Sequence, residues 1–305
     1  MERIFKNDKR IISMEQPLVS VITITRNRGN LIGRCIKSVL GQTYTNIEYI
    51  IVDGASEDNT DEVIASFKDD RLHYVKLDTN WPIKETLDHG ISLCKGKYIT
   101  FLDSDDEYLP EKIEKQVRKI ESLHEEYGLV YCWMTLYDNQ SKKVLKIQKP
   151  ELRGDVRDEV IGGPILSGTP TLMFREELLR KLGGWKSMEE LGIVSDWELC
   201  VRACQITKVD YVAESLVNVY ENHESVRQSD EKYYSKYYER CIKCHSYFLN
   251  TYASAIERKP ELGFYHYWVL FVSYIRLNRY GKSLYNMVKA FKSSPRYFVK
   301  KLING

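Results

Sequence analysis

Apolar residues in the first third of the chain follow two different spacings. Runs rich in apolar and β-branched residues predict four strands, at residues 18–25, 47–52, 72–76 and 98–102. Between these runs, apolar residues recur at every third or fourth position and predict helices at residues 31–40, 59–67 and 84–94. Asn30 is placed to cap the first helix and Gly41 to end it. Strands that alternate with helices indicate parallel βαβ units and an α/β fold.

Three of the predicted strands are followed by polar turns, at residues 25–30, 53–58 and 103–106. In parallel βαβ units the carboxyl ends of the strands lie at one edge of the sheet, where open α/β sheets bind their ligands. We therefore expect the three turns to converge on one crevice that holds the functional site.

The third turn carries the most distinctive chemistry, because an apolar strand ends there in Asp103, Ser104, Asp105 and Asp106. Side chains alternate along a strand, so Asp103 and Asp105 are expected to point to the same side. Neighbouring carboxylates repel each other unless a cation lies between them, and oxygen ligands suit Mg²⁺ or Mn²⁺. Such an ion could hold a diphosphate. The alternative is an ordinary polar turn in which Asp106 caps a helix that begins near Pro110.

Several segments, in this order and at this spacing, resemble the family-2 glycosyltransferases of the nucleotide-diphospho-sugar type. They lie at residues 19–27, 38–44, 48–60, 96–106, 183–185 and 195–202. The resemblance covers roughly residues 17–228 and is more specific than any single motif. It implies a GT-A fold, which is a Rossmann-like α/β sheet with helices on both faces, followed by a C-terminal helical extension.

The resemblance also implies a division of the chain. Residues 1–16 form a lead-in, and residues 17–230 form the catalytic domain. This domain has a nucleotide-binding half at 17–106 and an acceptor half at 107–230. Residues 231–305 form the helical, basic and tyrosine-rich C-terminal region.

Site residues follow from the matched motifs. A nucleotide-sugar donor, most often a UDP-sugar, is expected to contact Thr25, Arg26, Asn27, Asp53, Lys84, Asp103 and Ser104. The divalent cation, Mn²⁺ or Mg²⁺, is expected at Asp103, Asp105 and His223, although a histidine in such a loop can equally lie free on the surface.

Three departures from the family pattern bear on these assignments. Members often carry two consecutive Asp where this chain has Asp53-Gly54, and Ala-Arg-Asn where it has Thr86-Leu87-Asp88. The second change removes a phosphate-binding Arg, so the diphosphate is expected to depend more on the metal and on Arg26, Arg28 or Lys84. The usual acidic residue before the catalytic base is replaced by Ser195.

Asp196 is the candidate catalytic base, because the family motif is retained there. The resemblance implies a single displacement in which an acceptor hydroxyl attacks the anomeric carbon, so that the configuration is inverted. This reaction needs a base for the hydroxyl and charge stabilisation for the leaving diphosphate. The alternative role of Asp196 is to cap the helix that follows it.

The net charge of +2 conceals a strong asymmetry. Residues 232–305 carry 14 Lys and Arg, 3 Asp and Glu, and 12 of the 22 Tyr, so this region has a charge of +11 and the rest of the chain −9. Nothing here resembles a nucleic-acid recognition helix, a zinc site or an aromatic strand platform, so we expect no nucleic-acid partner. An acidic membrane surface or a polyanionic acceptor fits the charge better.

The same region predicts helices at residues 231–250, 252–256, 263–277 and 282–291. One of them carries an apolar stripe at helical spacing, made of Tyr267, Leu270, Phe271, Tyr274 and Ile275. This stripe could pack on the catalytic domain, pair with a second copy in a homodimer, or insert into a membrane surface.

The expected location is the cytoplasm, with or without peripheral contact at the inner face of the plasma membrane. The longest apolar run, Tyr267–Ile275, has nine residues, and a membrane-spanning helix needs about 20. Residues 1–16 are charged and interrupted, unlike a signal peptide. Seven scattered Cys, an odd number, agree with free thiols in a reducing compartment.

The motifs therefore favour a glycosyltransferase that uses a glycan or lipid-linked glycan of the cell envelope as acceptor. A sugar-1-phosphate nucleotidyltransferase would normally carry a glycine-rich loop with Arg after the first strand, where this chain has only Arg26-Asn27-Arg28-Gly29. A dinucleotide oxidoreductase would need G-x-G-x-x-G at that turn. A non-catalytic carbohydrate-binding or scaffold protein is the remaining alternative, against which the retained Asp103, Asp105 and Asp196 argue.

Overall fold

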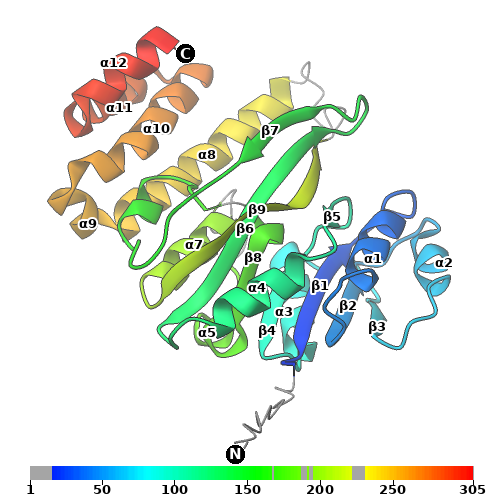
Figure 1. Ribbon diagram of the computed structural model, residues 1–305. Helices are drawn as coiled ribbons and strands as arrows, with labels where there is room; N and C mark the ends of the chain where they lie inside the picture. The colour runs from blue at the N-terminus through cyan, green and yellow to red at the C-terminus, as the bar shows by residue number, and fades with distance from the viewer. Residues whose placement is uncertain (1–15, 167, 187–190, 192–194, 222–230, 305) are drawn as a thin grey trace, which may run out of the picture.

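A nine-stranded mixed sheet forms the centre of the protein (Figure 1). The structure is a computed structural model, and it describes residues 16–166, 168–186, 191, 195–221 and 231–304. Four strands run parallel on one side of the sheet, in the order β3 (Leu72–Lys76), β2 (Ile47–Asp53), β1 (Val19–Thr25) and β4 (Tyr98–Phe101). These strands are those that the apolar runs predict, and β3 has the predicted bounds. They bring the three polar turns to one edge.

The other half of the sheet begins with β8 (Leu172–Arg175), which pairs antiparallel with β4 and with β6 (Tyr127–Asp138). The strand β9 (Lys208–Glu221) then runs parallel to β6 and pairs with the short β5 (Glu107–Tyr108). The remaining strand, β7 (Val144–Gln148), forms a hairpin with β6. The acceptor half of the chain therefore continues the same sheet rather than forming a separate one.

Helices cover both faces of the sheet and bury two apolar clusters. Val21 and Ile22 are consecutive in β1 and belong to different clusters, because side chains alternate along a strand. The first cluster packs under α3 (Ile83–Leu93), α5 (Glu176–Lys181) and α7 (Ser195–Cys204), and the second under α1 (Ile32–Leu40), α2 (Thr60–Ala65) and α4 (Lys112–Glu121). This burial on both faces explains the continuous apolar runs of the parallel strands.

The C-terminal region is helical, as expected. It consists of α8 (Glu231–Thr251), α9 (Ala253–Arg258), α10 (Phe264–Arg276), α11 (Tyr280–Ser293) and α12 (Pro295–Asn304). Phe248 of α8 belongs to the first apolar cluster, so this region is packed against one face of the sheet. Leu270 of α10 is buried, and the Ser283 hydroxyl of α11 donates to the Phe271 carbonyl at 3.0 Å. The apolar stripe of α10 therefore contributes to packing within the chain.

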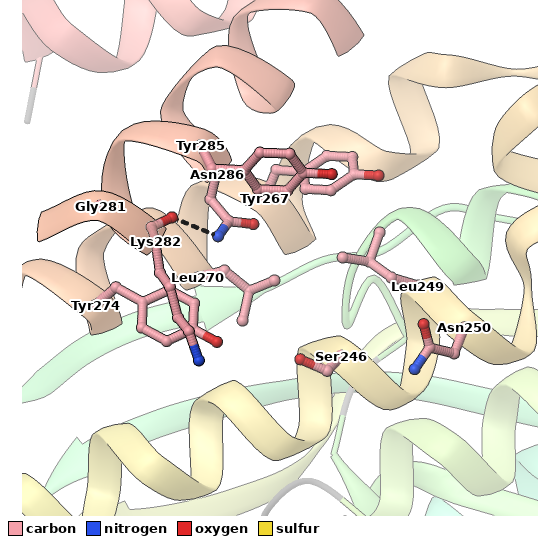
Figure 2. Close-up of a pocket in the computed structure, with 10 residues that line it drawn as sticks. All are labelled: Ser246, Leu249, Asn250, Tyr267, Leu270, Tyr274, Gly281, Lys282, Tyr285 and Asn286. Atoms are coloured by element: carbon pink, nitrogen blue, oxygen red, sulfur yellow. Dashed lines mark hydrogen bonds between the residues drawn. The ribbon is translucent and has the colours of Figure 1, made fainter. Parts of the chain in front are cut away.

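A cavity of about 510 Å³ lies between α8, α10 and α11 (Figure 2). Tyrosine rings and amide side chains line much of it, and no carboxylate does. In the described part of the chain, no helix combines the length and the apolarity needed to cross a bilayer.

Some local predictions were wrong. Leu31, not Asn30, occupies the N-cap position of α1, and it forms no side-chain capping bond. The strand β4 ends at Phe101, and the Asp106 amide donates to the Asp103 carbonyl at 3.0 Å, so residues 103–106 form a turn to which strand alternation does not apply. Asp106 also caps no helix, because α4 begins after Glu111. The helix α12 was not predicted.

Candidate functional site

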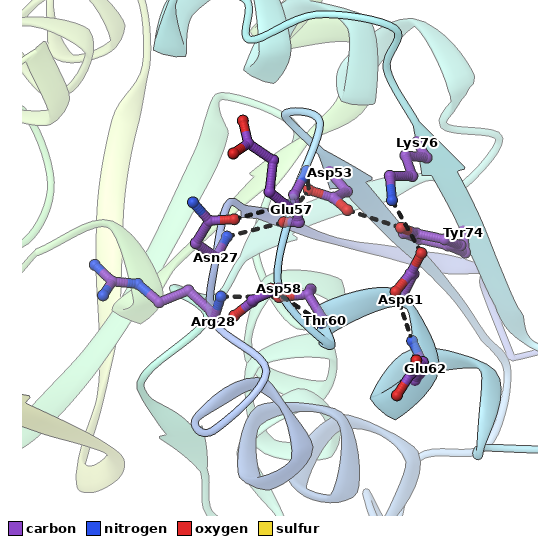
Figure 3. A network of polar contacts seen from close by, with 11 residues as sticks. Asn27, Arg28, Asp53, Glu57, Asp58, Thr60, Asp61, Glu62, Tyr74 and Lys76 are labelled. Carbon is purple, nitrogen blue, oxygen red and sulfur yellow. Dashed lines mark hydrogen bonds and ion pairs between the residues drawn. The ribbon is translucent and has the colours of Figure 1, made fainter.

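The loops after β1 and β2 are joined by hydrogen bonds at the predicted edge of the sheet (Figure 3). The Asn27 amide donates to Ser56 Oγ at 2.8 Å, and Asn27 Oδ1 accepts the Glu57 amide at 2.8 Å. Asn27 has φ of 52°, a left-handed conformation that Asn tolerates better than most residues. Asn27 itself is exposed and holds the two loops together.

Asp53 is buried beneath these loops and is bonded on both oxygens. Oδ1 accepts the Ser56 amide at 3.0 Å and the Ser56 hydroxyl at 2.5 Å, and Oδ2 accepts the Tyr74 hydroxyl at 2.7 Å. Burial, followed by this bond to Asp53, raises the pKa of Tyr74, which keeps its hydroxyl protonated as the donor. The structure thus gives Asp53 a role in shaping the loop, and its direct contact with the donor stays a prediction.

A crevice of about 240 Å³ opens beside these loops, and we call it the donor crevice. It is lined by Ile24, Thr25, Arg26, Arg28, Gly54, Asn80, Trp81, Ile83, Thr86 and Ser104. Three of the predicted donor contacts, Thr25, Arg26 and Ser104, are therefore brought together. Thr25 Oγ1 is buried and has no hydrogen-bond partner among the described residues. A buried hydroxyl without a partner is costly, which makes it a candidate contact for a bound polar group.

Sequence reasoning missed Asn80 and Trp81 in this crevice. Trp81 is 39% exposed and lies edge-on to His89, with ring centroids 5.6 Å apart. The signal was present, because residues 77–82 form a fourth turn at the same edge, after β3. An exposed indole there can stack on a planar ligand group.

Lys84, a predicted phosphate contact, pairs instead with Asp88 one helical turn away, with Nζ 2.6 Å from Oδ2. The other oxygen of Asp88 accepts the Trp185 amide at 3.2 Å. This chain of contacts connects α3 to the segment Gly183-Gly184-Trp185 of the acceptor half. The structure therefore gives Lys84 a role in positioning Asp88.

A second crevice of about 240 Å³ shares Ile24 and Ile83 with the donor crevice, and we call it the reaction crevice. It is lined by Ile22, Ile24, Ile83, Leu87, Phe101, Leu102, Asp103, Thr169, Trp185 and Asp196. Asp103 and Asp196, the predicted metal ligand and the predicted base, face the same space although they come from opposite halves of the chain. Thr169 was not predicted as a site residue, and nothing in the neighbouring sequence indicates that it lines this crevice.

Trp185 gives the reaction crevice a hydrogen-bond donor that has no partner among the described residues. Its indole packs edge-on against Phe101 at 5.6 Å, and Trp185 Nε1 is buried without a partner in the described part of the chain. The main chain before it is fixed by Arg202 of α7, which donates to the Leu182 carbonyl at 2.6 Å and to the Gly184 carbonyl at 2.8 Å. Arg202 is itself paired with buried Glu198 at 2.8 Å.

Asp196 lies in the first turn of α7, one residue after the helix begins at Ser195. It is thus not the residue that precedes the helix. Its Oδ1 accepts the Trp197 amide at 2.8 Å, and Thr169 lines the same crevice. Burial raises the pKa of Asp196, and the Trp197 amide together with the nearby polar groups of Thr169 partly offsets that effect. A partly desolvated carboxylate that faces a crevice is suited to accept a proton.

Carboxylates dominate the electrostatics of the reaction crevice. The pKa of Asp103 is raised to about 7, first by the surrounding protein and then by the charges of Asp105 and Asp196. Asp103 remains open to the water of the crevice, so its desolvation is incomplete. Burial and Asp103 raise the pKa of Asp106 to about 8, although the Tyr220 amide donates to Asp106 at 3.0 Å. A divalent cation would relieve this repulsion.

The residues present fit such a cation in part. Asp103 and Asp105 offer hard oxygen ligands, and the Asp105 carbonyl is held by the guanidinium of Arg34. Within residues 16–166, 168–186, 191, 195–221 and 231–304, no three His, Cys, Asp or Glu side chains are grouped as metal ligands. Mg²⁺ and similar ions are commonly held by one or two carboxylates together with substrate phosphates and water. His223, the third predicted ligand, lies outside the described residues.

Comparison with known proteins agrees with this geometry. Residues 20–183, more than half of the chain, match the model of glycosyl transferase family 2. The uncharacterized glycosyltransferase RT0329 of Rickettsia typhi is 30% identical over 204 residues, which cover 66% of this chain and 63% of that relative, so the match spans less than two thirds of the relative's length. TuaG of Bacillus subtilis is named as a proposed teichuronic acid biosynthesis glycosyltransferase. It is 38% identical over 104 residues, which cover 33% of this chain and 41% of TuaG.

Solved structures show the same fold at low sequence identity. S. aureus TarS 1–349 in complex with UDP-GlcNAc has a TM-score of 0.60 at 14% identity, covering 90% of this chain and 91% of that one. The mannosyltransferase PcManGT from Pyrobaculum calidifontis, in complex with GDP-Man and Mn²⁺, has a TM-score of 0.61 at 14% identity, covering 96% of this chain and 80% of that one. The expected GT-A type of fold, with a C-terminal helical region, is confirmed.

Proposed function

Since this chain belongs to glycosyl transferase family 2, we propose that it transfers a sugar from a nucleoside-diphosphate donor to a hydroxyl group of an acceptor. The observation that carries the proposal is that Asp103 and Asp196 face one crevice, which adjoins a second crevice lined by Arg26 and Arg28. A donor that occupies both crevices has its nucleoside beside the loops of the nucleotide-binding half. Its sugar then lies next to the candidate base.

The donor crevice suits a nucleoside diphosphate. Trp81 can stack on the base, the unpaired Thr25 hydroxyl can bond a polar group of the donor, and Arg26 and Arg28 can neutralise phosphate charge. Arg26 keeps only a distant ion pair with Glu57, at 3.8 Å, so it can turn to a phosphate at little cost. We take the donor to be a UDP-sugar, a choice supported by the UDP-GlcNAc complex of TarS.

Asp103 and Asp105 would hold a divalent cation, Mn²⁺ or Mg²⁺, with His223 as a further ligand. The cation would supply charge stabilisation for the departing diphosphate. The PcManGT complex with Mn²⁺ supports this choice. The excess of carboxylates around Asp103 supports it independently, because a bound cation lowers their mutual repulsion.

Asp196 would remove the proton of the acceptor hydroxyl. As the hydroxyl oxygen bonds to the anomeric carbon, the bond from that carbon to the β-phosphate oxygen breaks. The diphosphate leaves with the electron pair, and the hydroxyl proton goes to Asp196. One displacement inverts the anomeric configuration. Trp185 lines the same crevice, and its indole N–H, which has no partner among the described residues, can donate to a sugar hydroxyl and orient the ring.

The acceptor we propose is a glycan or lipid-linked glycan of the cell envelope. The support is the likeness to TuaG, whose name refers to teichuronic acid biosynthesis. We do not place the transfer in the cavity of Figure 2, because the described residues that line it include no carboxylate to hold a cation or to accept a proton.

The test is release of nucleoside diphosphate from a panel of nucleotide sugars with Mn²⁺, with or without excess EDTA. We expect release from one donor, loss of release in EDTA, and strong loss in Asp196→Asn. The control is Asp70→Asn, an exposed carboxylate on the α2–β3 connection. A nucleotidyltransferase would instead release pyrophosphate from a nucleoside triphosphate and a sugar 1-phosphate. A carbohydrate-binding protein without activity would do neither, and either result would contradict the proposal.

A further inference from the structure

The helix α11 exposes an apolar stripe on its outer side. Tyr280, Leu284, Val288 and Phe291 follow each other at spacings of four, four and three residues, so they lie along one face of the helix. They are 65%, 58%, 42% and 48% exposed. The opposite side of α11, with Ser283, Asn286 and Ala290, is buried in the chain. The stripe is thus not part of the core.

The helix α12 extends this apolar surface. Phe298 is 7% exposed and packs edge-on against Phe291 of α11, with ring centroids 5.5 Å apart, which fixes the two helices together. Val299, Leu302 and Ile303 are 49%, 59% and 76% exposed. The red helices α11 and α12 lie at the end of the molecule that is remote from α1 and α2 (Figure 1). We call their exposed apolar and basic side chains the terminal face.

The charge of the terminal face has only one sign. Residues 262–305 contain eight Lys and Arg and no Asp or Glu. Four of these basic residues, Lys292, Arg296, Lys300 and Lys301, are exposed beside the apolar side chains. Apolar residues flanked by basic ones on a helix surface are typical of helices that lie in the plane of an anionic membrane.

We propose that the terminal face docks on the surface of an anionic lipid bilayer. The exposed apolar side chains would enter the boundary between headgroups and acyl chains, and the four basic side chains would contact lipid phosphates. The charge argues against a second copy of this chain as the occupant, because a symmetric pairing would bring two sets of basic residues together. The proposal is independent of the proposed catalytic activity.

The experiment is co-sedimentation of the full chain with vesicles of phosphatidylcholine alone or with 30% phosphatidylglycerol. Each Lys or Arg near an anionic surface contributes about fivefold to binding, so Lys292→Gln, Lys300→Gln and Lys301→Gln together should weaken it on the order of a hundredfold. The matched control removes the same charge from exposed positions of the nucleotide-binding half, with Lys37→Gln, Lys68→Gln and Lys95→Gln, and should bind like the parent.

A second variant tests the apolar part without changing charge. Leu302→Ser with Ile303→Ser should lower binding at least tenfold, because two exposed side chains can no longer enter the bilayer. Thermal unfolding midpoints near that of the parent would show that both variants fold. Equal binding to vesicles with and without phosphatidylglycerol, or unchanged binding of both variants, would overturn the proposal. A dimer in sedimentation velocity that these Ser substitutions convert to a monomer would overturn it in favour of a second copy.

Discussion

Trp197 of α7 stacks on Phe248 of α8, with ring centroids 4.1 Å apart and ring planes within 18° of parallel. Trp197 directly follows Asp196, the candidate base, and its Nε1 donates to the Val160 carbonyl at 2.7 Å. The C-terminal helices therefore support the helix on which the candidate base lies. Deletion of all the C-terminal helices would therefore disturb α7 as well, and it would not test the membrane contact of the terminal face by itself.

Phe248→Ala should destabilise the protein by about 3–5 kcal/mol, the usual cost of truncating a fully buried Phe. Urea unfolding monitored by circular dichroism measures this change. The control is Tyr280→Ala, at a side chain that is 65% exposed, which should change the unfolding free energy by less than about 1 kcal/mol. Similar effects of the two substitutions would show that α8 is not packed as described.

Acid should weaken the packing of the C-terminal helices. His245 and His266 are buried with their Nδ1 atoms 3.1 Å apart, and His266 Nε2 lies 2.8 Å from the Ile161 carbonyl. Burial lowers the pKa of His245 to about 3, with a further effect from His266, and lowers that of His266 to about 4. Both histidines are therefore neutral in the folded protein at pH 7.

In the unfolded chain the two histidines become protonated near pH 6.5, their ordinary pKa. Below that pH the unfolded chain therefore binds more protons than the folded chain. The stability that the pair contributes is complete above about pH 6.5 and is lost as pH falls toward 4, by about 1.4 kcal/mol per pH unit for each histidine. Urea unfolding between pH 7 and pH 4.5 measures the slope. His245→Leu should give a smaller slope than the parent, and an unchanged slope would refute this explanation.

Asp196→Asn should lower kcat by roughly 10²–10⁴, the usual share of general-base catalysis, and leave donor affinity nearly unchanged. Asn can still accept the Trp197 amide, so the fold should persist. Steady-state kinetics and a donor-binding titration separate the two effects. The product configuration, read by NMR, should be inverted. An active variant together with a retained configuration would exclude the single displacement.

Asp105→Asn should lower kcat/KM by about 100-fold or more and weaken Mn²⁺-dependent nucleotide binding, because the proposed cation, which would stabilise the leaving diphosphate, loses a charged ligand. Calorimetric titration of UDP with and without Mn²⁺ measures the binding. Asp70→Asn serves again as the control. Full activity of Asp105→Asn, or of the parent in excess EDTA, would rule out the cation.

Local patterns were sufficient to predict the parallel half of the sheet. β1, β2 and β4 are buried on both faces, so their runs are mostly apolar or β-branched. β3 is only partly buried, and its predicted bounds, Leu72–Lys76, match the structure. The insertion of β8 between β4 and β6 depends on pairing between distant residues, and no local pattern indicates it. The helix α12 was missed, although it begins at Pro295 and Pro is favoured in a first helical turn.

The candidate site was predicted from the family motifs and not from the spacing of apolar and polar residues. Alternation along a strand gave the wrong reason for pairing Asp103 with Asp105, since both lie in a turn. The convergence of Asp103 with Asp196 followed only from the family resemblance, because they are 93 positions apart in the chain, with four strands between them. Thr169 reaches its crevice through tertiary folding, and its residue type did not distinguish it from other polar residues. Trp81, in contrast, could have been found from its place in the turn after β3.

The double glycine before Trp185 imposes unequal constraints on the evolution of this chain. Gly183 and Gly184 both have left-handed backbone conformations, with φ of 70° and 74°. A side chain at Gly183 would meet open space, so this position can drift to Asn or Asp, which tolerate that conformation. A Cβ at Gly184 would come within 2.9 Å of Asp88 Cγ, whose carboxylate bonds both Lys84 and the Trp185 amide. Relatives that lose this second glycine should therefore be found only where the residue at position 88 has changed as well.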